Sequence, residues 1–403
     1  MNILFLTMVS INSINERGIY TDLLRQFVKN KDNVFIVSPV ERKYKQQTTF
    51  IKNDNITLLK VKTFNIQKTN IIEKGIGILA IEHQYLKAIK KYFPDIKFDL
   101  VLYSTPPITL SRVIDFIKKR DNAYTYLLLK DIFPQNAVDL KLIKNKGFLH
   151  RIFLKKERKL YQISDTIGCM SEANEQYIIK HNKSIDVSKV EINPNSIFPL
   201  ENYKKTDEFK IALRKKYNIP LGKYIYIYGG NLGQPQGIDF LLTTITNTTN
   251  KDVFFLIVGS GTAYPKVNNW FKINKPQNAH LLSLLPKEDF DNLLSICDVG
   301  LIFLNKRFTI PNFPSRLLSY LEMKLPVIAA TDVNTDIGKV IEDYNCGLWL
   351  ESGNTTKMIN VIDKMIIDKN QLEIMKENAW KLLVDKYHVS RSYELISEKL
   401  KNV

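Results

Sequence analysis

The chain has 403 residues, of which 44% are hydrophobic, and a net charge of +17. This length exceeds one core of ordinary size and predicts two domains, while the apolar content excludes a disordered chain. Its three cysteines, Cys169, Cys297 and Cys346, stand far apart, which argues against a disulfide framework or a zinc knuckle and favours the cytosol. No apolar run approaches the roughly 18 residues of a spanning helix, and the first residues predict a buried strand rather than a signal peptide.

Strand and helix patterns alternate along the first half of the chain. Short apolar runs predict strands at residues 3–8, 34–37, 56–61, 100–103, 124–129, 166–170 and 187–192. Amphipathic patterns, such as residues 21–29 and 78–92, predict helices between them. Strands that are regularly separated by helices favour a parallel sheet covered on both faces.

The alternation stops at residues 193–205, where two prolines and several turn formers predict a linker, and then resumes. Further strands are expected at 224–228, 253–258, 280–284, 299–303, 327–330 and 347–350. We therefore predict an α/β protein of two Rossmann-like, doubly wound domains, residues 1–195 and 206–385, with a C-terminal helix in 386–403 that packs back on the first domain. Because such sheets bind ligands at the carboxyl ends of their strands, the two domains are expected to face each other across a cleft.

Positive charge is concentrated in the first half. Residues 1–200 hold 32 Lys and Arg against 19 Asp and Glu, a net charge of +13, which leaves +4 for the remainder. The densest part, residues 141–159, interleaves basic and apolar residues and could lie on an anionic membrane, with Lys155, Lys156 and Lys159 facing the lipid. A solvated helix with an apolar core side explains the same pattern and is favoured when the segment is considered alone.

Residues 224–242, YIYIYGGNLGQPQGIDFLL, predict a strand that runs through glycines into a helix. Free backbone N–H groups at a helix start, and the missing Cβ atoms of Gly230 and Gly233, suit a bound diphosphate. A tight turn that needs glycine only for its dihedral angles is an equal alternative. Gly259 and Gly261 also follow a strand, but Tyr264 stands where a dinucleotide fingerprint has its third glycine, which argues against a nicotinamide cofactor.

A second helix start is expected at Pro314 and Ser315. Arg316 falls in its first turn, where a guanidinium can clamp a phosphate beside free amides. A surface ion pair is the alternative, but two anion-suited helix starts in one domain favour a diphosphate ligand. The Asp289 and Asp291 pair is assigned to the acidic first turn of a helix, and the five histidines are isolated, so no metal is expected.

Several motifs together carry a family resemblance. The order GGNLG, GIDFLL, FLIVGSG, FPSRLLSYLEMKLPVIAA and CGLWLESG resembles the nucleotide-sugar domain of GT-B glycosyltransferases of family 4. In the first half, ERGIYTDLL, YSTPP and KDIFPQNAVDL resemble members that build O-antigen and capsule repeat units, including amino-fucose transferases. The resemblance implies transfer with retention, without metal or other cofactor, from a nucleotide-diphosphate sugar. The expected donor is a UDP-sugar, with an N-acetylated amino or deoxy-amino sugar as one option.

The chain departs from the family pattern at several places. Asn231 and Gln236 stand where many members have an Arg and a Lys that bind the donor diphosphate, and Ser319 replaces a ribose-binding glutamate, with Glu322 one turn further on as a substitute. The donor-binding residues that we expect are Gly230, Asn231, Gly233, Gln236, Gly259, Ser315, Arg316, Ser319 and Glu322.

Catalytic candidates must come from strand ends of the first domain. Asp131 follows a predicted strand and is our preferred base or acceptor-orienting group, with a helix cap as the alternative; Glu16 ranks second, and Gly18 would let backbone approach a ligand. The basic first domain suits an acceptor such as a polyprenyl-diphosphate-linked saccharide at the inner face of the cell membrane, where the protein would be a cytoplasmic, peripheral enzyme.

Three alternatives stay open at this stage. A GT-B sugar-nucleotide epimerase would use the same donor domain, a nucleic-acid-binding protein would explain the charge although no such motif is present, and an inert GT-B scaffold would explain Gln236 and Ser319.

Overall fold

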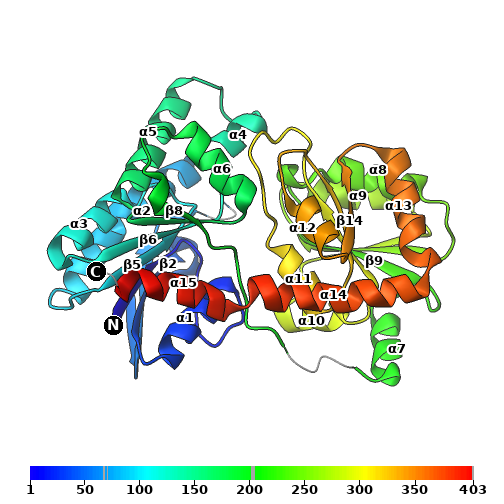
Figure 1. Ribbon diagram of the computed structural model, residues 1–403, viewed down its shortest axis with the longest axis horizontal. Coiled ribbons are helices and arrows are strands. Elements are labelled where there is room, and N and C mark those ends of the chain that lie inside the picture. Colours follow the sequence, from blue (N-terminus) through cyan, green and yellow to red (C-terminus); the bar gives the residue numbers. More distant parts are fainter. Residues whose placement is uncertain (67–68, 70, 201–204, 402–403) are drawn as a thin grey trace. The chain divides into compact units, whose positions relative to one another are not determined.

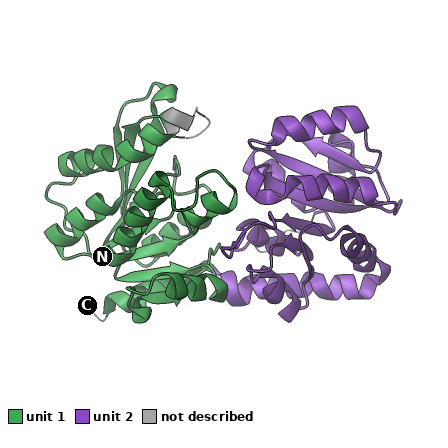
Figure 2. Ribbon diagram, turned by 90° about the horizontal axis from the view of Figure 1, so that it is seen from above, with its two compact units in different colours: residues 1–198, 389–403 green, residues 199–388 purple. Residues whose placement is uncertain are grey.

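The computed structural model describes residues 1–66, 69, 71–200 and 205–401, and it divides into two compact units (Figure 2). Unit 1 comprises Met1–Phe198 and Val389–Val403, and unit 2 comprises Pro199–His388. Both units have a mainly parallel sheet covered by helices on both faces, which confirms the predicted α/β, doubly wound class (Figure 1). None of the described helices is long and apolar enough to cross a membrane.

Unit 1 contains an eight-stranded sheet in the order β3-β4-β2-β1-β5-β6-β7-β8. Its strands are β1 (Asn2–Leu6), β2 (Asn33–Glu41), β3 (Thr49–Asn53), β4 (Ile56–Thr63), β5 (Leu100–Ser104), β6 (Tyr124–Leu129), β7 (Thr166–Cys169) and β8 (Val190–Ile192). Its helices are α1 (Ile19–Lys29), η1 (Arg42–Tyr44), α2 (Ile71–Tyr92), α3 (Ser111–Asp121), α4 (Gln135–Asp139), α5 (Phe148–Ile163), α6 (Glu172–His181), η2 (Val187–Lys189) and α15 (Val389–Lys401).

The core of unit 1 explains how the last helix returns to it. Phe27 of α1 and Ile396 of α15 belong to the same buried cluster as the inward side chains of β1, β2, β5 and β6. The ring of Tyr393 meets Phe27 edge-on, with centroids 4.9 Å apart. Lys399 adds an ion pair to Glu191 at 2.8 Å. Helix α15 is therefore part of this domain, although it is separated from the rest of unit 1 by the whole of unit 2.

Unit 2 contains a six-stranded, fully parallel sheet in the order β11-β10-β9-β12-β13-β14. Its strands are β9 (Tyr224–Asn231), β10 (Val253–Ser260), β11 (Ala279–Leu282), β12 (Val299–Phe303), β13 (Val327–Thr331) and β14 (Gly347–Glu351). Its helices are α7 (Asp207–Lys216), η3 (Gln234–Gln236), α8 (Ile238–Asn247), α9 (Tyr264–Asn274), α10 (Lys287–Leu294), α11 (Arg316–Glu322), α12 (Ile337–Asp343), α13 (Thr355–Ile367) and α14 (Lys369–Tyr387).

Close packing of helices on the unit 2 sheet is achieved with glycines. A Cβ atom on Gly229 would lie 2.3 Å from the ring of Phe290 in α10, and one on Gly300 would lie 2.5 Å from the ring of Tyr320 in α11. Both helices therefore lie directly on strands β9 and β12, and α11 brings its first residue, Arg316, to the carboxyl end of the sheet.

Most predicted strands are present, and two differ from the expectation. Strand β3, antiparallel to β4 at the sheet edge, was not predicted, because all its residues are exposed and its sequence TFIKN lacks a buried face. Residues 187–192 form a 3-10 turn followed by the short strand β8 instead of one strand. Asp289 does lie in the first turn of a helix, α10, as predicted.

Candidate active site

The glycine stretch forms the carboxyl end of β9, the turn η3 and the start of α8. Gly230 and Gly237 have φ values of 122° and 55°, which favour glycine. Strand β9 continues to Asn231, beside Ser260 of β10, and the amide of Leu232 donates to the carbonyl of Ser260 at 2.8 Å. Of the backbone N–H groups between Gly230 and Gly233 that could bind a diphosphate, that of Leu232 is therefore excluded, because it is used by the sheet.

Gly259, predicted to bind the donor, has a different structural reason. A Cβ atom there would lie 1.9 Å from the carbonyl oxygen of Gly230 on the neighbouring strand. Glycine is thus required at residue 259 because the ends of β9 and β10 are in close contact, whether or not a ligand is bound.

Arg316 lies directly beside this glycine turn. Its Cζ and Nη2 atoms are 3.8 Å from the position of a Cβ atom on Gly230, which is van der Waals contact distance, so the guanidinium lies directly against this glycine. Its Nη1 atom is buried and has no hydrogen-bond partner within the part of the chain that the structure describes. The structure therefore brings the glycine turn and Arg316 together, and it leaves one buried donor atom of the guanidinium without a partner among the described residues.

Two tyrosines hold this arrangement, and neither was identified from the sequence. The Arg316 guanidinium lies over the ring of Tyr228, 4.4 Å from its centroid. The Tyr228 hydroxyl donates to the carbonyl of Asn231 at 2.7 Å. Tyr320 accepts a hydrogen bond from the amide of Gly229 at 3.0 Å and donates to the carbonyl of Leu301 at 3.1 Å. The available sequence signal was their place among apolar residues close to candidate donor-binding residues: Tyr228 lies two residues before Gly230, and Tyr320 directly follows Ser319.

The two residues that replace family cations contact each other. The Asn231 Nδ2 atom donates to Gln236 Oε1 at 3.2 Å, and a Cβ atom on Gly233 would lie 2.9 Å from that nitrogen. The pair rigidifies the turn but brings no charge, which makes Arg316 the main cation beside Gly230.

Around α11, the remaining donor candidates are placed differently. Ser315 is exposed before the helix and its side chain caps no amide, and Ser319 is half-buried. Glu322 is only 3% exposed, and its Oε1 atom accepts a hydrogen bond from the amide of Leu200 at 2.9 Å. The expectation that Glu322 replaces the missing ribose ligand is therefore corrected, since burial and this bond fix its carboxylate within the packing of unit 2.

In unit 1, Asp131 lies just beyond the carboxyl end of β6. Its Oδ1 atom accepts a hydrogen bond from Asn136 Nδ2 at 2.8 Å, and its amide donates to Thr105 Oγ1 at 3.3 Å. Burial raises the pKa of Asp131 to about 6, although hydrogen bonds from Asn136 and the amide of Ile132 oppose the shift. Asp131 does not cap α4, whose N-cap is Pro134. A carboxylate whose pKa lies near neutrality is suited to accept a proton.

Lys130, the neighbour of Asp131, was missed by sequence reasoning. Burial lowers the pKa of its ammonium to about 7, with the Cys169 thiol opposing this shift. The amide of Lys130 donates to the same Thr105 hydroxyl at 3.1 Å. A lysine directly after an apolar strand was the available signal, because the end of a parallel strand is where such a side chain reaches a ligand.

The other candidates of unit 1 are less constrained. Glu16 is exposed in the loop before α1, and its backbone carbonyl accepts from Arg25 at 2.9 Å. Gly18 has a φ of 172°, which any residue adopts, and its amide donates to Asp22 at 3.2 Å. The backbone at residue 18 therefore does not itself require glycine, and the approach of backbone to a ligand there stays a prediction. Lys155 and Lys159 are exposed on α5, and Lys156 is half-buried.

Among the described residues, no group of His, Cys, Asp and Glu side chains has the arrangement of a metal site. The candidate donor site thus consists of Arg316 and the glycine turn in unit 2. The candidate acceptor site consists of Asp131 in unit 1, which Lys130 precedes in the sequence.

Comparisons with known proteins define the class. Residues 209–382 match the model of the family "Glycosyl transferases group 1". The chain is 22% identical to the probable glycosyltransferase WbjE of Pseudomonas aeruginosa over 72% of this chain and 71% of that protein. It is 21% identical to the putative colanic acid biosynthesis glycosyl transferase WcaI of Escherichia coli K12, over 76% of each.

The crystal structure of Anabaena HepE in complex with UDP superimposes with a TM-score of 0.71 at 15% identity, over 100% of both chains. Unit 2 thus carries a group 1 glycosyltransferase domain, and the fold is GT-B. The protein is a glycosyltransferase, as the resemblance in its sequence implied.

Proposed function

We propose that the protein transfers a sugar, with retention at the anomeric carbon, from a UDP-sugar to a lipid-linked saccharide during synthesis of a surface polysaccharide. The observation that carries the donor half of this proposal is the buried Nη1 atom of Arg316 beside Gly230, which has no hydrogen-bond partner in the described parts of the chain. The UDP bound by HepE, a protein of the same fold, is consistent with this choice of nucleotide.

Arg316 suits a diphosphate for two reasons. A guanidinium offers a planar fork of donors that matches phosphate oxygens, and charge-assisted bonds of this kind are about twice as strong as neutral ones. The site is also rigid, because Tyr228 and Tyr320 fix the guanidinium and the strand end before a ligand arrives. A preorganised cation at the leaving group stabilises the charge that develops there in the transition state.

Asp131 is our candidate for the acceptor side. Its raised pKa leaves it ionised at neutral pH yet able to take a proton from an acceptor hydroxyl, or to orient that hydroxyl. Lys130 is not assigned to the acceptor, because burial lowers the pKa of its ammonium to about 7 and its Nζ atom donates to the Asn193 carbonyl at 3.4 Å. No metal is included, and we expect transfer to persist in the presence of a chelator.

Our choice of acceptor is supported by the positive charge of residues 1–200 and by the names of related proteins. The net charge of +13 on residues 1–200, with Lys155, Lys156 and Lys159 on α5, favours an acceptor displayed on an anionic membrane. A polyprenyl-diphosphate saccharide at the inner face of the cell membrane has this property. The name of WcaI, which refers to colanic acid biosynthesis, supports a role in polysaccharide assembly, and an amino or deoxy-amino sugar is the donor class that we would test first.

A thermal-shift panel of nucleotides and nucleotide sugars tests the donor. A ligand present at 100 times its dissociation constant should stabilise the fold by about 2.7 kcal/mol. We expect UDP and one UDP-sugar to raise the melting temperature, and GDP- and dTDP-sugars to have little effect. A panel without any response, together with strong retention on heparin, would replace the transferase by a nucleic-acid-binding protein.

Product analysis tests the reaction. With the donor so identified and a membrane fraction as acceptor, a new glycosidic bond with the anomeric configuration of the donor is expected. Conversion of the donor to an isomer when no acceptor is present would instead identify an epimerase, and neither product would indicate an inert scaffold.

A further inference from the structure

The segment between α4 and the start of α5 presents apolar side chains that no described residue of unit 1 covers. Leu142 is 64% exposed, Phe148 79% and Leu149 54%, and we call these three residues the apolar tip. Exposed large side chains that are scattered singly need no explanation, but three within eight residues are unusual. Phe153, one turn further along α5, is instead half-buried and packs its ring against Phe133, with centroids 5.0 Å apart.

The apolar tip is held in a fixed conformation. The backbone amide of Lys146 donates to Nδ1 of the buried His150 at 2.9 Å, and the amide of Gly147 donates to the carbonyl of Lys144 at 3.0 Å. The amide of Leu142 donates to the carbonyl of Ala137 at 2.8 Å. The segment is therefore attached to α4 on one side and to α5 on the other.

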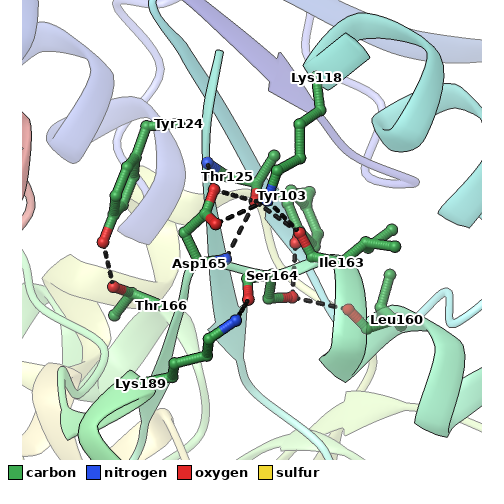
Figure 3. Close-up of polar contacts among 10 residues, drawn as sticks. All are labelled: Tyr103, Lys118, Tyr124, Thr125, Leu160, Ile163, Ser164, Asp165, Thr166 and Lys189. Carbon is green, nitrogen blue, oxygen red and sulfur yellow. Dashed lines mark hydrogen bonds and ion pairs between the residues drawn. The ribbon is translucent and has the colours of Figure 1, made fainter. Parts of the chain in front are cut away.

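The far end of α5 is anchored as well. Ser164, after the last turn, shares a hydrogen bond of 2.6 Å with the Tyr103 hydroxyl, and the carbonyl of Ile163 accepts from Thr125 Oγ1 at 2.8 Å (Figure 3). Asp165 forms an ion pair with Lys118 at 2.6 Å (Figure 3). Since both strands β5 and β6 take part, α5 is a rigid support that carries the apolar tip on and just before its N-terminal end.

Positive charge surrounds the apolar tip. Lys141, Lys144, Lys146 and Arg151 are exposed, and none of them has an ion-pair partner among the residues that the structure describes. The one acidic residue of this segment, Glu157, is buried, bonds to the Tyr161 hydroxyl at 3.0 Å, and has its pKa raised to about 7 by burial. It therefore does not neutralise the surface.

We propose that Leu142, Phe148 and Leu149 insert into the headgroup region of an anionic phospholipid bilayer while the surrounding lysines and Arg151 bind lipid phosphates. Apolar side chains within a basic rim match a surface whose charge is negative and whose interior is hydrocarbon. A second copy of the chain would bring the same positive charge and be repelled. The inference rests on the proposed function only in that a lipid-linked acceptor gives the enzyme a reason to dock there.

Vesicle sedimentation with the full-length protein tests the docking. The wild type should bind phosphatidylglycerol vesicles strongly and phosphatidylcholine vesicles weakly, and part of the binding should survive high salt, which screens charges but not apolar contacts. The double variant Phe148→Ser/Leu149→Ser should bind about tenfold more weakly and lose the salt-resistant fraction. The matched control Ile367→Ser alters an equally exposed side chain, also 79%, in unit 2 and should bind like the wild type.

Fluorescence separates insertion from mere adsorption. The three native tryptophans, Trp270, Trp349 and Trp380, all lie in unit 2. A Phe148→Trp variant should show additional tryptophan emission that shifts to the blue when vesicles are added and is quenched by brominated lipid. The emission of the wild type gives the background from the three native tryptophans. Unchanged binding of the double variant, or an unshifted emission, would overturn the inference. So would absence of vesicle binding, even if an acidic protein partner were captured by the same segment.

Activity keeps the two proposals apart. On a water-soluble acceptor analogue, Phe148→Ser/Leu149→Ser should transfer sugar at the wild-type rate, whereas on acceptor in vesicles its rate should fall with its binding. If the wild type binds vesicles through the apolar tip but transfers no sugar to any acceptor, the docking surface stands and the proposed function fails.

Discussion

The two units place their functional side chains by different means. In unit 2, Arg316 is held against Gly230 by aromatic rings and backbone hydrogen bonds, so the site is formed without a ligand. In unit 1, Thr105 holds the backbone of Lys130 and Asp131 after β6, Asn136 already occupies one oxygen of the Asp131 carboxylate, and the exposed apolar tip follows before and on α5. This difference is instructive. Many transferases bind the same donor diphosphate, whereas each transferase must recognise its own acceptor. We expect unit 2, with its unpartnered cation, to determine donor affinity, and unit 1, with its carboxylate, to determine rate and partner.

Removing the cation of unit 2 should have the largest effect. Arg316→Ala takes away the charge that stabilises the leaving diphosphate, and kcat/KM for the donor should fall by about 10²–10³-fold. Arg316→Lys keeps the charge but loses the fork and the stacking on Tyr228, and should recover only part of the activity. Initial-rate kinetics with varied donor measure this, and Lys381→Ala, an exposed cation on α14, serves as control. Wild-type kinetics of Arg316→Ala would contradict the assignment.

Asp131→Asn should lower kcat by about 10²-fold or more while leaving the KM for the donor nearly unchanged. The wild type needs the ionised carboxylate, and since burial raises the pKa of Asp131 to about 6, its rate should fall as the pH drops through that value. The variant should lack this acidic limb. Asp54→Asn, in the exposed turn between β3 and β4, is the matched control. A pH profile of the variant that parallels the wild type would remove Asp131 from the chemistry.

The same residue should reveal itself in stability. A carboxyl whose pKa is higher in the folded chain than its usual 3.8 destabilises the fold above about pH 6, and this cost disappears as the pH falls toward 3.8. Asp131→Asn should therefore raise the free energy of unfolding at pH 7.5 but not at pH 4. Denaturant titrations of the wild type and the variant at the two pH values test this. If the variant changes the free energy of unfolding equally at both, ionisation of Asp131 does not destabilise the fold.

Changes at Tyr228 should have intermediate effects that separate its two contacts. Tyr228→Leu removes the ring beneath Arg316 and should raise the donor KM by about 3- to 30-fold, the value expected for a cation–π contact of 0.5–2 kcal/mol. Tyr228→Phe keeps the ring and loses the hydroxyl that bonds to the Asn231 carbonyl and interacts with Arg316, so its effect should be smaller. If both variants were equally impaired, the hydroxyl rather than the ring would position the guanidinium.

The smallest effect is expected from restoring charge to the turn. Gln236→Lys places a cation where many family members have one, and should lower the donor KM by roughly twofold to fivefold because the half-exposed charge is screened. Titration with the donor at low and high salt checks the result. A weaker donor affinity would indicate that the bond between Asn231 and Gln236 is more important than the missing charge.

Much of the fold could be predicted because its strands are buried on both faces. Apolar runs such as residues 124–129 and 299–303 have no alternative to a central strand, and they define both sheets. Strand β3 could not be found this way, since Phe50 and Ile51 are exposed and the strand exists only because β4 pairs with it.

The site was only partly predictable for a related reason. Arg316 and Gly230 could be named from local motifs, but Tyr320 acts on the backbone of Gly229, which lies far away in the sequence, and Tyr228 acts through its ring against Arg316, which is equally distant. Glu322 was misjudged because the sequence does not show that Leu200 packs against it. Likewise the basic pattern of α5 was recognised, yet which of its apolar residues are exposed was known only from the fold.

Calorimetric titration of UDP into the wild type, Arg316→Ala and Lys381→Ala tests the central claim most directly. The account predicts that the wild type and Lys381→Ala bind UDP with equal affinity and that Arg316→Ala binds about a hundredfold more weakly. Equal affinity of all three proteins would show that the diphosphate is held elsewhere and would contradict the account.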